Sequence, residues 1–109
     1  MTQYVYFVHQ IHPYESFSLH QTKEGTNKTV ERLSQDVINT LKAAADRSTM
    51  KNNSRVLLNA ASDISNDFTE FIMLKSFYPG QHYIIDAGLD DGFEERRFHI
   101  TIELKDINE

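Results

Sequence analysis

The chain of 109 residues has the size of one domain, because a second module and its linker would need more chain. It contains no cysteine, which excludes disulfides, thiol catalysis and cysteine-ligated metal centres, and we expect no cofactor. The net charge of −5 lies entirely in residues 82–109, which hold eight acidic and three basic residues. This distribution argues against direct binding to a nucleic-acid backbone, which requires a basic surface.

Targeting and membrane signals are also missing from the sequence. The first residues lack the basic segment and following apolar stretch of a secretory signal. No run approaches the ~18 consecutive apolar residues of a membrane-spanning helix. We therefore expect a cytoplasmic protein.

Two strands are predicted at the start of the chain. Residues 4–11 are dense in β-branched and aromatic side chains and stop before Pro13. Residues 16–22 alternate, so that Phe17 and Leu19 share one face and the polar residues share the other. We expect these strands to pair as a hairpin, with most of their aromatic side chains in the core.

One helix is predicted over residues 29–47, where apolar side chains recur at helical spacing and form a single stripe. Its N-cap is expected among Thr26, Asn27 and Thr29, whose side chains can accept a hydrogen bond from the first turn. The polar run 48–54 is expected to end the helix and form a loop.

The remaining chain is predicted to form strands, at residues 55–60, 68–78, 82–86 and 97–105. The segment 68–78 also fits a helix face. A strand is favoured there because Pro79-Gly80 suits the centre of a type II turn, which would join this segment to the next as a hairpin. Another turn is expected at residues 90–92.

These elements predict an α+β domain over residues 1–109, with one main helix (about 29–47) packed on an antiparallel sheet of five or six strands. Their order is ββα followed by a β-meander. One helix covers only part of such a sheet. The second face is therefore expected to be solvated, buried in a homodimer or used to bind a partner.

Two histidine-x-threonine pairs are the feature most suggestive of catalysis: His20 with Thr22, and His99 with Thr101. Residues two apart in a strand point to one face, so each pair would present an imidazole beside a hydroxyl. The pairs resemble the motifs of the two-histidine phosphoesterase superfamily. The resemblance implies that the four residues flank a nucleotide or RNA phosphodiester, with one histidine as base and the other as acid.

Metal sites have weaker support in the sequence. His9 and His12 could contribute imidazole ligands, but the chain bends at Pro13 and a strand end with exposed imidazoles explains them as well. Residues 90–95 are similar to part of a calcium loop, yet they lack its alternating oxygen ligands, and a hairpin turn accounts for them. We expect no metal site.

The favoured hypothesis is a small acidic protein that binds and blocks a larger, basic, nucleic-acid-handling protein, as immunity proteins, antitoxins and phage counter-defence inhibitors of this size and charge do. A binding protein is preferred to an enzyme, and the phosphoesterase-like enzyme is the alternative. The residues expected to contact the partner are the acidic side chains of the C-terminal region and two strand tyrosines: Asp86, Asp90, Asp91, Glu94, Glu95, Tyr4 and Tyr6.

Overall fold

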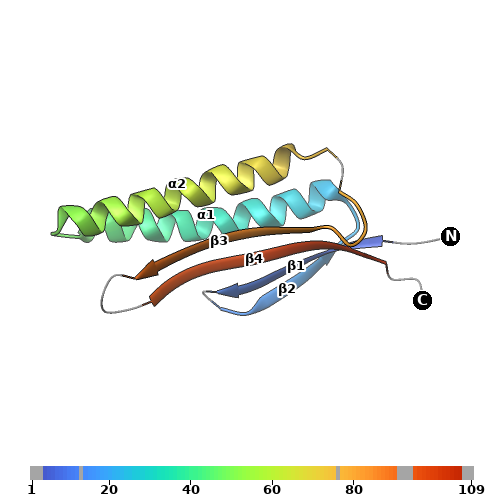
Figure 1. Ribbon diagram of the computed structural model, residues 1–109, viewed down its shortest axis with the longest axis horizontal. Helices are drawn as coiled ribbons and strands as arrows, with labels where there is room; N and C mark the ends of the chain where they lie inside the picture. Colours follow the sequence, from blue (N-terminus) through green and yellow to red (C-terminus); the bar gives the residue numbers. More distant parts are fainter. Residues whose placement is uncertain (1–3, 13, 76, 91–94, 107–109) are drawn as a thin grey trace.

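The computed structural model describes residues 4–12, 14–75, 77–90 and 95–106. In these residues the elements follow the order ββααββ: β1 (Tyr4–His12), β2 (Ser16–His20), α1 (Lys23–Arg47), α2 (Lys51–Met73), β3 (His82–Asp90) and β4 (Glu95–Asp106). The strands form one antiparallel sheet in the order β2-β1-β4-β3. Both helices lie on one side of this sheet, and no described element covers the other side (Figure 1). The predicted α+β class is confirmed.

The strands at the two ends of the chain match the sequence pattern. β1 and β2 form the predicted hairpin, in which Phe7 lies opposite Leu19. The predicted strands at 82–86 and 97–105 are also present, as parts of β3 and β4. β4 pairs with both β1 and β3, so the chain returns to the centre of the sheet at its end and does not form a simple meander.

The prediction of one helix and five or six strands is wrong, because the segments expected as strands at 55–60 and 68–78 fall largely within α2. The buried residues of α2 are spaced at one helical face: Leu57, Ala60, Ala61, Ile64 and Phe71. Such a stripe can be buried against a sheet only if the whole segment is helical. Within the described residues, neither α2 nor any other helix is long and apolar enough to cross a membrane.

The start of α1 also differs from the prediction, because the helix begins at Lys23 and not near Thr29. Its N-cap is Thr22, whose Oγ1 accepts a hydrogen bond from the Gly25 backbone N–H at 3.0 Å. This bond satisfies one of the backbone donors that the first helical turn leaves free. Thr26 is fully buried inside the helix, where its hydroxyl donates to the Thr22 carbonyl at 2.8 Å.

A tight turn connects α2 to β3. Gly80 has a positive φ of 84°, and the Gln81 N–H donates to the Tyr78 carbonyl at 2.9 Å, as the Pro79-Gly80 pair predicts. The turn is confirmed, but it follows a helix and does not join two strands of a hairpin.

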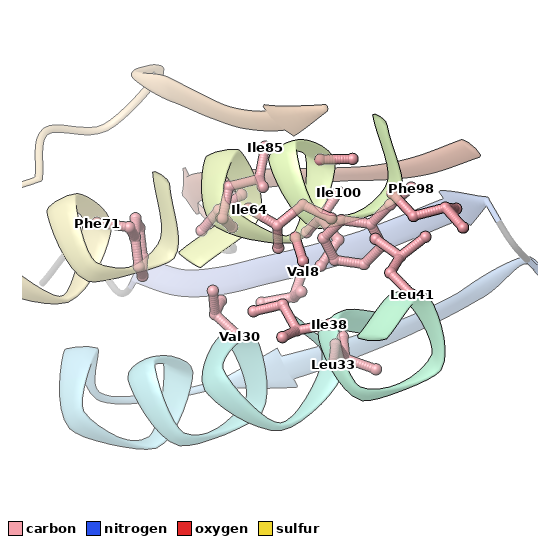
Figure 2. Close-up of a cluster of buried hydrophobic side chains, with 14 of the residues drawn as sticks. Val8, Val30, Leu33, Ile38, Leu41, Ile64, Phe71, Ile85, Phe98 and Ile100 are labelled. Atoms are coloured by element: carbon pink, nitrogen blue, oxygen red, sulfur yellow. The ribbon is translucent and has the colours of Figure 1, made fainter. Parts of the chain in front are cut away.

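The core lies between the helices and the covered face of the sheet. Side chains from both layers meet there, among them Val30 and Ile38 of α1, Ile64 and Phe71 of α2, and Ile100 of β4 (Figure 2). Four of these five are fully buried, and Ile38 is 3% exposed. Burial on this scale is the main source of stability for a two-layer domain.

Lys23 links the beginning of α1 to the end of α2. Its Nζ donates hydrogen bonds to Asn27 Oδ1 at 2.7 Å and to the Phe71 carbonyl at 2.9 Å, and it lies 4.1 Å from the centroid of the Phe71 ring. The Phe71 carbonyl is among the last four of α2 and also accepts a hydrogen bond from the Leu74 N–H at 3.1 Å. Lys23 therefore caps α2 with a positive charge at the negative end of its dipole.

Candidate functional site

The candidate site is the face of the sheet opposite the helices, which we call the open face. Its members follow from the alternation along β4, where Phe98, Ile100 and Ile102 are buried beneath the helices. His99 and Thr101 lie between them and therefore point to the open face. The register extends this assignment to the other strands, because residues directly opposite each other share a face.

Two rows of side chains cross the whole open face. One row contains Leu19, Phe7, Glu103 and His82, and the other contains Phe17, His9, Thr101 and Ile84, each in the order β2, β1, β4, β3. The half of the face formed by β2 and β1 is thus mainly apolar, and the half formed by β4 and β3 is mainly polar.

The apolar half contains a patch that we define as Phe7, Phe17 and Leu19. Phe17 is 68% exposed and Leu19 is 60% exposed, while the Phe7 ring lies 5.9 Å from that of Phe17. The Nζ of Lys105 lies 4.6 Å from the centroid of the Phe7 ring, so a cation borders the patch. The solvated face of an antiparallel sheet is usually polar, so a cluster of large side chains left this exposed is a candidate interaction surface.

The polar half contains two contacts between a histidine and a carboxylate. His99 Nδ1 lies 3.5 Å from Asp86 Oδ1, and His82 Nε2 lies 3.7 Å from Glu103 Oε1. The Asp86 side chain is 54% exposed and that of Glu103 is 26% exposed. Two carboxylates of the acidic C-terminal region therefore share the open face with the apolar patch.

The two histidine-x-threonine pairs are not brought together. His20 lies opposite Tyr6, which in turn lies opposite the buried Leu104, so His20 is on the helix-covered side of the sheet. His99 and Thr101 are on the open face. Since the sheet separates the two imidazoles, they cannot flank one phosphorus, and the arrangement that the phosphoesterase resemblance implies is absent.

The first of these pairs has local structural contacts instead. Thr22 caps α1, and the Nε2 of His20 lies 2.9 Å from the Ser18 hydroxyl. A methyl group placed on Gly25 would lie 3.2 Å from Thr22 Oγ1 and 3.8 Å from His20 Nδ1. The tight approach of the chain at this point explains why a glycine occupies the first turn of α1.

The imidazoles considered as metal ligands lie on or near the open face. His9 lies opposite Thr101, and His12 lies opposite His99 beyond an irregularity in the pairing of β1 with β4. In the part of the chain that the structure describes, no three histidine or acidic side chains are placed to hold a metal ion together.

The acidic residues expected to contact a partner are only partly described. Asp86 is on the open face, and the backbones of Asp90 and Glu95 pair with each other at the end of the β3–β4 ladder. Asp91 and Glu94 lie outside the described residues. Of the acidic residues expected to contact a partner, Asp86 is therefore the one whose side chain can be assigned to the open face.

The two tyrosines expected to contact a partner lie on the other side. Tyr6 is half-buried on the helix-covered side, where its ring lies 6.0 Å from that of Phe77. Tyr4 is on the same side as Tyr6 and is 42% exposed. Tyr6 thus packs against the core and is not part of the open face, because both helices cover the side of the sheet to which it points.

Phe17 and Leu19 are the functional candidates that sequence reasoning missed. The alternation of residues 16–20 predicts that they share one face, and the expectation that most strand aromatics are in the core includes Phe17. Ile84 is a further apolar side chain of the open face and is 55% exposed on β3. An apolar strand face indicates that other residues will bury it. The sequence does not show whether those residues belong to the same chain or to a partner.

Comparisons with protein-family models, with curated proteins and with solved structures find no match to this chain.

Proposed function

We propose that this protein is a small binding protein that blocks a larger, basic, nucleic-acid-handling protein by docking against it with the open face. The observation that carries the proposal is the patch, in which Phe17 and Leu19 are exposed and Phe7 is half-buried, on a face that no described element covers (Figure 1). Large apolar side chains surrounded by polar groups have the composition of a protein-binding surface, with a desolvated centre and a hydrated rim.

The charge of the open face supports a basic partner. Glu103 lies opposite Phe7, where its carboxylate is 3.9 Å from the Nζ of the bordering Lys105, and Asp86 lies on β3, which β4 separates from the patch. The same two strands contain the acidic residues Asp90 and Glu95, so acidic residues outnumber Lys105 in this half of the sheet. Complementary charge at the rim of an interface accelerates association and selects among partners, while the apolar centre supplies most of the affinity. A protein that binds nucleic acid presents the positive surface that such a rim requires.

Capture from the native host lysate tests the proposal when wild type is compared with matched variants. Phe17→Ser with Leu19→Ser removes the patch, and Val56→Ser with Leu58→Ser makes the same change at exposed apolar residues of α2. We expect a basic protein to be retained by wild type and by the α2 variant and lost from the patch variant. Equal retention by all three would contradict docking through the open face.

Charge reversal tests the second part of the proposal. Asp86→Lys with Glu103→Lys should slow association with the captured protein, and so should lysine substitutions at Asp90, Asp91, Glu94 and Glu95. Glu31→Lys with Asp36→Lys, at exposed positions of α1, is the matched control. An association rate that is the same in all variants would remove the electrostatic argument.

A homodimer through the open face stays a prediction, since a second copy could also cover the patch. Sedimentation velocity over a range of protein concentrations distinguishes the two occupants. The proposed function predicts a monomer. A dimer that dissociates in the Phe17→Ser, Leu19→Ser variant would assign the open face to self-association instead.

A further inference from the structure

The outer edge of β3 is a second candidate binding surface. β3 lies at one end of the sheet, so the backbone N–H and C=O groups on its outer side have no strand partner among the described residues. The strand has nine residues, contains no proline and pairs with β4 in an uninterrupted register from His82 to Asp90. The opposite edge strand, β2, has only five residues. A long, regular edge without proline is a template for strand addition.

Acidic side chains flank this edge on the helix side. Asp63, Asp67 and Glu70 lie four and three residues apart on α2 and so follow one another along one helix face. The Tyr83 hydroxyl donates to the Asp67 backbone carbonyl at 3.1 Å, which places this acidic stripe beside β3. On the open-face side of the same strand, Asp86 is also exposed.

The carboxylates of the acidic stripe are close enough to influence one another. Burial raises the pKa of Asp67, and the neighbouring Glu70 and Asp63 carboxylates raise it further. The pKa of Tyr83 is raised by burial and then by Glu70 and Asp67. The ion pairs found among the described residues do not include any of the three carboxylates. The β3 edge is thus bordered by three carboxylates that form no ion pair among the described residues.

We propose that the β3 edge accepts an extended, basic segment of another protein, which adds to the sheet as a fifth strand. Backbone hydrogen bonds would hold the segment. Its alternate side chains would reach the acidic stripe on one side and Asp86 on the other, so lysine or arginine suits both positions. A second copy of this chain is a poor occupant, because pairing two β3 edges would bring two acidic stripes to one junction. The edge is separate from the patch, so the inference does not depend on the proposed function.

A synthetic peptide of alternating lysine and valine, seven residues long with blocked ends, is the probe. We expect saturable binding, with slower exchange of backbone amides in β3 measured by NMR. The same peptide with its three central amides N-methylated keeps its charge but cannot donate the backbone hydrogen bonds of an added strand, and it should bind at least about tenfold more weakly. Equal binding of the two peptides would overturn strand addition. Slower amide exchange confined to β2 would overturn the assignment to the β3 edge.

Protein variants test the contribution of the acidic stripe. Asp63→Asn, Asp67→Asn and Glu70→Gln together should weaken peptide binding about fivefold or more. The control changes the same number of charges at exposed positions of α1, by Glu31→Gln, Asp36→Asn and Asp46→Asn, and should alter binding less than about twofold. An equal loss of peptide binding in both variants would mean that only the net charge of the protein matters, which would contradict the proposal. Slow exchange of β3 amides in a dimer without peptide would assign the edge to a second copy.

Discussion

The rings of Phe7 and Phe17 lie 5.9 Å apart on neighbouring strands of the open face, and Phe17 is 68% exposed although Phe71, on the other side of the sheet, is fully buried. The same residue type therefore has two roles in this fold. Phe71 stabilises the contact between the two layers, whereas Phe17 contributes an apolar surface that folding does not use.

The first prediction separates these two roles. Phe17→Ser with Leu19→Ser should lower the free energy of unfolding by less than about 1 kcal/mol, because only an exposed cross-strand contact is lost. Phe71→Ala should lower it by about 3–5 kcal/mol, because a buried ring is replaced by a cavity. Urea unfolding of each variant measures both values. A large loss in the first variant would mean that the patch is part of the core.

The second prediction concerns Lys23, which joins the ends of the two helices. Lys23→Met should lower the free energy of unfolding by roughly 1 kcal/mol, because the Phe71 carbonyl loses a charged donor at the end of α2. The effect stays modest because burial lowers the pKa of Lys23, which shows that desolvation opposes the charge. Lys28→Met, at an exposed position of α1, is the control. Equal stability of the two variants would contradict the cap.

The third prediction follows from the raised pKa of Asp67. A carboxyl whose pKa is higher in the folded state binds its proton more tightly there, so stability falls as the pH rises through that range. Asp67→Asn removes the ionised carboxylate and should raise the melting temperature at about pH 7, with a gain that disappears near pH 3. Melting curves across this range measure the difference between variant and wild type. A pH-independent difference would point to a cause other than ionisation.

The fourth prediction tests the structural role of Thr22. Thr22→Ala should lower the free energy of unfolding by about 1 kcal/mol, since it removes the N-cap of α1. Thr22→Ser keeps the hydroxyl and should restore most of that stability. Chemical unfolding of the two variants is the measurement. No difference between alanine and serine at this position would mean that the hydroxyl does not cap the helix.

The elements that the sequence predicts correctly have a complete local pattern. Residues 29–47 carry a long apolar stripe at helical spacing, and 97–105 alternate throughout, so packing only confirms the local preference. In α2 the pattern is interrupted, because Val56 and Leu58 are apolar but exposed on the outer side of the helix. Short apolar runs of this kind fit a strand as well as a helix, and only packing against β3 and α1 decides between them.

The candidate site was harder to predict than the fold. Alternation along β4 correctly places His99 and Thr101 away from the core. It cannot show that His20 points to the opposite side of the sheet, because that depends on how β2 pairs with β1. Nor can it show that both helices cover one face. This arrangement exposes Phe17 and Leu19 and directs Tyr6 toward Phe77.

The affinity of the captured protein for three versions of this chain tests the role of the open face most directly. Calorimetric titration should give similar Kd values for wild type and for the Val56→Ser, Leu58→Ser control. The Phe17→Ser, Leu19→Ser variant should bind at least about tenfold more weakly, as expected when the apolar centre of an interface is removed. A Kd that is unchanged in the patch variant while the control variant loses binding would place the interface on the helices and contradict docking through the open face.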